Sequence, residues 1–108
     1  MSRSIGVHKA EVLEEILNTN SLGAFSSPLE MEGMVYVGMY VCGDSGSHSS
    51  HVVTLQVSPN GTDWFDTNDT VTGTGFVKQD LIVATEIRAK VTTAEGATST
   101  CKVYLIVE

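Results

Sequence analysis

His48 and His51 are the residues whose type and spacing come closest to those of a metal site. Two neighbouring imidazoles can share a zinc ion, and a small metal-dependent enzyme built on them is one hypothesis. A stable site needs more ligands, and no Cys, Asp or Glu stands at a recognised ligand spacing beside this pair. The pattern therefore favours two ordinary loop histidines and predicts no metal.

Asp63, Asp66 and Asp69 recur at every third position and suggest calcium. An EF-hand loop would place oxygen ligands at alternate positions, with a central Gly and a closing Glu, and these are missing. Serine is frequent, yet no Gly-x-Ser-x-Gly nucleophile turn occurs. The sequence thus predicts no catalytic residue and no cofactor, and it disfavours an enzyme.

Residues 52–66 predict a β-hairpin, because an apolar strand runs into a Ser-Pro-Asn-Gly reversal and then into aromatic residues. Pro59 presets φ for a turn, and Asn60 and Gly61 tolerate positive φ. Trp64 and Phe65 should then point to opposite faces of the returning strand. Trp64 could stack on a sugar, but packing in the core or on the hairpin is the favoured interpretation.

Composition describes one small domain with no nucleic-acid or membrane partner. The chain has 108 residues, 42% of them apolar, which suits a packed globule. The net charge is −7, and the six Lys and Arg residues are scattered, so a surface for polyphosphate is not expected. No apolar run approaches the ~18 residues of a membrane helix, and no secretory signal is visible. We expect a protein made in a cytoplasm, with Cys42 and Cys101 as free thiols rather than a disulfide.

Alternating apolar residues and turn signals predict an all-β fold, a single antiparallel β-sandwich of seven or eight strands. An extended N-terminal arm is expected at 1–9 and the sandwich domain at 10–108. The expected strands lie at 34–42, 51–57, 64–66, 70–72, 76–77 with 81–83, 86–93 and 102–108, preceded by a short extended piece at 28–31.

Two segments leave alternatives open. Residues 10–18 have apolar positions at helical spacing, but an edge strand is preferred because everything after them is β. Residues 34–42 are apolar on both faces, which predicts a central strand covered on both sides or a strand at a subunit contact.

Several segments together resemble small β-sandwich virion proteins of tailed bacteriophages. Those proteins typically combine a Ser-x-Asp/Asn-Gly-x-x-Trp hairpin, an Ile/Leu-Arg-x-Lys-Val strand and a short last strand. The corresponding segments here are Ser58-Pro59-Asn60-Gly61-Thr62-Asp63-Trp64, Ile87-Arg88-Ala89-Lys90-Val91 and Val103-Tyr104-Leu105-Ile106-Val107, and the resemblance covers residues 30–108.

The resemblance implies a non-enzymatic structural role, with a capsid decoration (cement) protein as the specific expectation. It implies assembly in the host cytoplasm onto the capsid surface, with the major capsid protein or other virion proteins as partners. It also implies a homo-oligomer, a trimer or a dimer. The expected interaction residues are Ser2, Arg3, Ile5, Val7, Met34, Tyr36 and Tyr40. Deleting residues 1–9 should weaken binding to particles.

One alternative is a tail or fibre accessory protein or a carbohydrate-binding adhesion module. Cell-surface adhesins share the same hairpin, so the resemblance does not separate these roles. A carbohydrate module would use Trp64, Tyr36 or Tyr40 in an exposed aromatic patch.

Overall fold

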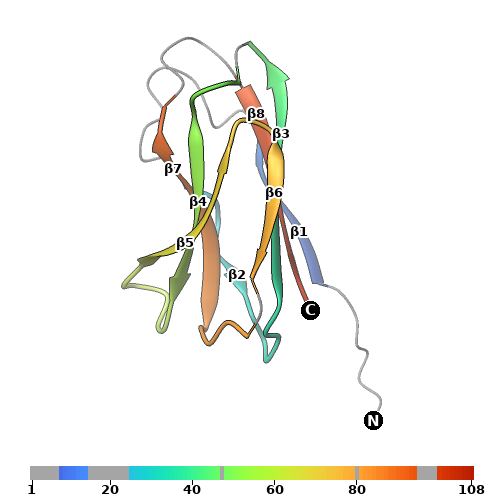
Figure 1. Cartoon of the computed structure of the whole chain (residues 1–108). Helices are drawn as coiled ribbons and strands as arrows, with labels where there is room; N and C mark the ends of the chain where they lie inside the picture. Colours follow the sequence, from blue (N-terminus) through green and yellow to red (C-terminus); the bar gives the residue numbers. More distant parts are fainter. Residues whose placement is uncertain (1–7, 15–24, 47, 80, 95–99) are drawn as a thin grey trace.

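The computed structural model describes residues 8–14, 25–46, 48–79, 81–94 and 100–108, which form eight strands (Figure 1). The strands are β1 (His8–Glu14), β2 (Leu29–Glu30), β3 (Val37–Ser45), β4 (Val52–Ser58), β5 (Phe65–Thr72), β6 (Gly75–Gln79), β7 (Glu86–Thr93) and β8 (Thr100–Val107). None of the described residues forms a helix that could cross a membrane.

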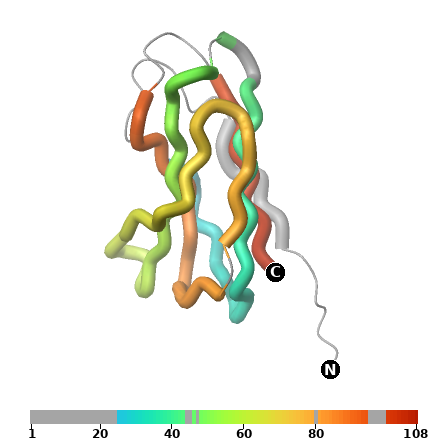
Figure 2. The backbone as a smooth tube through the Cα atoms, viewed as in Figure 1, coloured from blue at the N-terminus to red at the C-terminus, as the bar shows by residue number. Residues whose placement is uncertain are grey.

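The strands form two four-stranded sheets with the orders β1-β8-β3-β6 (sheet A) and β2-β7-β4-β5 (sheet B). Every pairing is antiparallel, and the first strand pairs with the last, the second with the seventh, the third with the sixth and the fourth with the fifth. The chain is thus a long ribbon rolled up on itself, which is the jelly-roll form of the sandwich. The backbone tube shows the passage from sheet B to sheet A between β5 and β6 (Figure 2).

The core lies between the sheets and is built from alternate residues of the central strands. Met39, Leu55, Ile87 and Leu105 are among the largest side chains that are fully buried there. The inward alternation expected for 86–93 and 102–108 is confirmed, because Ile87, Ala89, Val91, Val103, Leu105 and Val107 are all buried.

The strand interpretation of residues 10–18 is confirmed for positions 10–14, which belong to β1. The backbones of His8 and Lys9 pair with Val107 and Ile106, so β1 begins two residues before the expected domain start. Positions 15–18 lie outside the described residues, as do Ser2, Arg3, Ile5 and Val7 of the expected arm.

Two expectations about strands are wrong. The segment 34–42 is not covered on both sides, because Val37, Met39 and Val41 are buried whereas Tyr36 and Tyr40 are exposed, and its alternative, a strand at a subunit contact, stays a prediction. Residues 81–83 form no strand but a loop that follows β6.

The hairpin between β4 and β5 is confirmed, and its turn is held by side chains of the expected residues. The Ser58 hydroxyl accepts hydrogen bonds from the backbone N–H groups of Asn60 and Gly61, at 3.2 and 2.7 Å. The Asn60 side-chain oxygen accepts from the N–H groups of Thr62 and Asp63, both at 2.8 Å. Gly61 takes the positive φ of 82°, so Asn60 contributes a capping side chain and Gly61 the unusual backbone. Pro59 lies exposed in this turn.

Cys42 and Cys101 are free thiols on neighbouring strands. Cys101 is buried and lies opposite Gly43, whereas Cys42 is exposed on the other face of the sheet. Two side chains on opposite faces of a sheet cannot bridge, which explains why the disulfide does not form.

Candidate functional site

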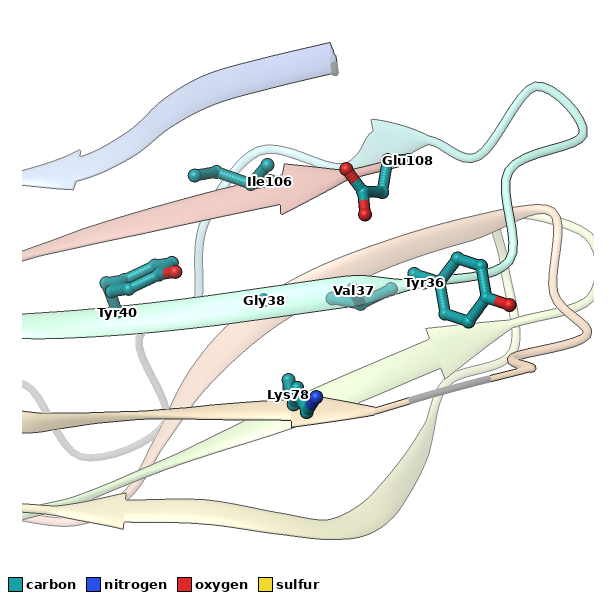
Figure 3. A pocket seen from close by; sticks show the side chains of 7 residues that line it. All are labelled: Tyr36, Val37, Gly38, Tyr40, Lys78, Ile106 and Glu108. Atoms are coloured by element: carbon teal, nitrogen blue, oxygen red, sulfur yellow. The ribbon is translucent and has the colours of Figure 1, made fainter. Parts of the chain in front are cut away.

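An open groove of about 390 Å³ lies on the outer face of sheet A (Figure 3). We call it the Gly38 groove, after the residue in the middle of its floor. Its lining residues are Tyr36, Val37, Gly38, Tyr40, Lys78, Ile106 and Glu108. Three neighbouring strands build it, because Gly38 of β3 pairs with Ile106 of β8 on one side and with Lys78 of β6 on the other.

The glycine at position 38 makes room for the ring of Tyr40. Gly38 and Tyr40 lie on the outward face of β3, and Tyr36 comes just before the strand with its side chain exposed. A Cβ atom on Gly38 would lie 3.2 Å from Cε1 of Tyr40. The Tyr40 ring therefore lies along the strand and reaches over the glycine (Figure 3).

The two tyrosines of the groove are exposed to solvent and also make contacts within the chain. Tyr36 and Tyr40 are 44% and 39% exposed. Tyr40 stacks on Phe76 of β6, its cross-strand neighbour, with ring centroids 5.2 Å apart and planes inclined by 14°. Tyr36 is fixed through its backbone, which exchanges hydrogen bonds of 2.9 and 3.0 Å with Glu108. The ring of Tyr40 and the backbone of Tyr36 are thus both held by contacts within the chain.

A second exposed feature is the loop at residues 81–85, between β6 and β7. Leu81 and Val83 are 70% and 96% exposed, while Ile82 between them is buried and donates a backbone hydrogen bond of 2.8 Å to the carbonyl of Val35. Leu81 has a φ of 60°, a left-handed conformation that costs a non-glycine residue about 1–2 kcal/mol. An anchored, strained loop thus holds two apolar side chains out in solvent.

The outer face of sheet B is closed by its own side chains. Asp66, Gln56 and Arg88 lie side by side on β5, β4 and β7. The Gln56 amide donates to the Asp66 carboxylate at 2.6 Å, and Arg88 Nε donates to the Gln56 side-chain oxygen at 2.7 Å. The guanidinium lies between the rings of Phe25 and Trp64, at 3.9 and 4.2 Å from their centroids. Desolvation by this burial lowers the pKa of Arg88.

Trp64 consequently packs on Arg88 of β7 and is not among the buried core residues. It lies on a different sheet from Tyr36 and Tyr40, so the structure does not bring the three aromatic residues of the carbohydrate alternative together. Met34 is half-buried and packs against the core, and it does not line the groove.

His48 and His51 pack edge to face, with ring centroids 5.5 Å apart. His51 is buried, and its Nε2 lies 2.9 Å from the carbonyl oxygen of Gly73. In the part of the chain that the structure describes, no three His, Cys, Asp or Glu side chains are grouped to hold a metal ion. Asp63 accepts a hydrogen bond from the Asn60 amide and Asp66 one from Gln56, so these carboxylates serve separate local contacts.

The sequence analysis missed Val37, Gly38, Lys78, Ile106 and Glu108 in the groove, Phe76 behind Tyr40, and Leu81 and Val83 in the loop. The groove residues were detectable in part, since Lys78 and Ile106 occupy outward positions of alternating strands. Their convergence on Gly38 depends on strand order and register, which no local pattern reveals.

Neither a protein-family profile nor a curated protein matches this sequence. Solved structures share the fold. The protein YomS derived from the SPBc2 prophage is similar with a TM-score of 0.62 and 10% identity, over 99% of this chain and 98% of that one. A subunit of Bacillus endospore appendages, described as disulfide-linked pili, has a TM-score of 0.52 and 12% identity, over 99% and 93%. The family 29 carbohydrate-binding module CBM29_1 of Piromyces equi has a TM-score of 0.52 and 11% identity, over 96% and 80%.

At such identities the likeness shows the fold alone. The chain is a small jelly-roll β-sandwich, of a form found in a prophage protein, in a pilus-like appendage and in a carbohydrate-binding module. The expectation of a small β-sandwich resembling phage proteins is therefore supported at the level of the fold.

Proposed function

We propose that this protein is a non-enzymatic structural component of a phage virion, specifically a decoration protein that binds the major capsid protein on the capsid surface. The observation that carries the proposal is the 81–85 loop, which holds Leu81 and Val83 in solvent on a strained backbone. Strain of this kind persists where the surrounding structure enforces it, and it is concentrated at functional sites.

The loop suits insertion into an apolar hollow of a larger protein. Exposed Leu and Val side chains gain roughly 1.5–3 kcal/mol each when a partner buries them completely. Ile82 is already fixed in the core and bonded to Val35, so little conformational entropy remains to be lost on binding. The whole-length similarity to the prophage protein YomS is in keeping with a phage origin.

The N-terminal arm is the second element of the proposed attachment. Because His8 and Lys9 pair with β8, a deletion that tests the arm must stop at residue 7 and leave β1 intact. We further propose that the protein acts as a trimer or a dimer, which mass photometry of the purified protein would measure directly.

The test is cosedimentation with undecorated capsids of the source phage. The double variant Leu81→Ser/Val83→Ser should lose binding at least tenfold, whereas Phe65→Ser should bind as the wild type does. Phe65 is a matched control because it is an apolar side chain that is 57% exposed on β5. Saturable binding that survives the double variant would move the docking surface elsewhere. Absence of wild-type binding would exclude capsid decoration and favour a tail or fibre accessory role.

A further inference from the structure

The Gly38 groove is a preformed trough of mixed character. Tyr40, backed by Phe76, and Ile106 offer apolar surface, while Lys78 and Glu108 offer a cation and a carboxylate at its margins (Figure 3). The two tyrosine hydroxyls add neutral groups that donate and accept hydrogen bonds. A ligand that fits must present a flat apolar side and polar groups around its edge.

The position of the groove within the sheet excludes one common occupant. An extended peptide binds a sheet by pairing its backbone with a free strand edge. Strand β3 is already paired with β8 and β6 on its two sides, so its backbone N–H and C=O groups are engaged. Recognition in the groove therefore depends on side chains.

The charges of the groove and of the whole chain limit the kind of ligand that can bind. Among the described lining residues, Lys78 supplies a cation and Glu108 a carboxylate. The chain as a whole carries a net charge of −7, so a polyanion would be repelled by this background. The ligand should be uncharged.

We propose that the Gly38 groove binds a neutral oligosaccharide of β-1,4-linked pyranoses laid along β3. A pyranose has an apolar C–H face that stacks on an aromatic ring, and hydroxyl groups that bond to charged and phenolic side chains around it. Tyr36 and Tyr40 are four residues apart on one strand, roughly 13 Å along its axis, which accommodates a short run of sugar rings. This binding goes beyond the docking role, which uses the 81–85 loop.

Four of the lining residues have a defined part in this interaction. Tyr40 supplies the stacking plane and Phe76 keeps that plane in position. Lys78 donates to ring hydroxyls, and the Glu108 carboxylate accepts from them. Gly38 leaves room for the Tyr40 ring to lie along β3, so a side chain at position 38 would displace the stacking plane.

The experiment is a titration of the full chain with cellohexaose, xylohexaose and mannohexaose, followed by NMR chemical shifts and by calorimetry. We expect shifts centred on Gly38, Lys78 and Ile106 with at least one of the three. Gly38→Val displaces the Tyr40 ring that lies over the glycine, and because a β-branched residue suits an extended strand, the variant should fold and lose binding. Tyr40→Ala should weaken binding about tenfold, in line with the loss of one aromatic contact.

Phe65→Ala is the control, because it removes an exposed aromatic ring outside the groove and should leave sugar binding unchanged. The proposal is overturned if none of the three sugars binds, if Gly38→Val binds as well as the wild type, or if an oligogalacturonate hexamer binds better than the neutral chains. Failure of the proposed capsid docking can be told apart from failure of the proposed sugar binding. Leu81→Ser/Val83→Ser should keep sugar affinity, and Gly38→Val should keep capsid binding.

Discussion

The outer faces of the two sheets both carry aromatic and charged residues, but one face is closed by contacts within the chain and the other is open. On sheet B the aromatic rings of Phe25 and Trp64 enclose Arg88, which is bonded through Gln56 to Asp66, so that the face is closed by contacts within the chain. On sheet A the rings of Tyr36, Tyr40 and Phe76 remain exposed around a groove.

The difference shows that an aromatic residue near a charge is not by itself a binding site. Trp64 stands beside an arginine and opens the returning strand of a hairpin, yet its cation partner comes from its own chain. Tyr40 stacks on the neighbouring ring of Phe76, and its side chain is 39% exposed at the groove. Trp64 and Tyr40 differ in whether the chain itself supplies a charged partner for the aromatic ring.

The largest expected effect on stability comes from removing Arg88, the centre of the side-chain contacts on the outer face of sheet B. Arg88→Ala deletes two cation–ring contacts and leaves the buried Gln56 side-chain oxygen without its donor, which should lower the free energy of unfolding by about 3 kcal/mol. Urea denaturation measures this value. A loss below about 1 kcal/mol would mean that the sheet B face is not held together by this arginine.

The next effect concerns the turn through which the chain passes from sheet B to sheet A. Gly73 has a φ of 73°, and a Cβ atom there would lie 2.5 Å from the backbone carbonyl oxygen of His48. Gly73→Ala should therefore lower the free energy of unfolding by about 2 kcal/mol or more. Thermal denaturation tests this, with Gly75→Ala as the milder control, since its Cβ would meet Val71 at an ordinary 3.5 Å.

A smaller effect is expected from a second polar contact on sheet B. The hydroxyls of Thr54 and Thr92 are 2.8 Å apart. A double-mutant cycle with Thr54→Val and Thr92→Val should give a coupling energy of about 1 kcal/mol, the usual contribution of one hydrogen bond. Additive single effects would show that the two hydroxyls do not depend on each other.

The smallest effect on stability should come from sheet A. Tyr40→Ala removes an exposed ring that stacks on Phe76, and the free energy of unfolding should fall by less than about 1 kcal/mol. The same urea experiment that measures Arg88→Ala provides the comparison. Equal losses in the two variants would remove the distinction between a closed face and an open one.

Local patterns predicted much of the fold. The alternation in residues 86–93 and 102–108 gave the correct buried faces, and the Ser-Pro-Asn-Gly reversal gave the hairpin, because both signals depend on adjacent residues. The prediction of a strand at residues 81–83 was wrong, because a run of three apolar residues can occur in a strand or in a loop. Nothing in the sequence reports the left-handed backbone of Leu81.

The groove was harder to predict than the strands that form it. Tyr36 and Tyr40 were identified as interaction candidates, but Gly38 reads as an interruption of an apolar strand. Its role depends on Lys78 and Ile106, which come from distant parts of the chain through the register of β3 with β6 and β8. Which residues meet at Gly38 can therefore be known only once the order of the strands in the sheet is known.

The rolled-up ribbon also has a consequence for the time course of synthesis. Among the described strands, β4 and β5 are the sequence neighbours that pair within one sheet, so their hairpin can form early and locally. Sheet A needs β8 between β1 and β3, and β8 is the last of the described strands to be translated. Until β8 has left the ribosome, β1 and β3 therefore lack their shared partner. Folding dominated by such distant pairings takes milliseconds to seconds, and during that interval unpaired strand edges would be open to chaperones or to other nascent copies.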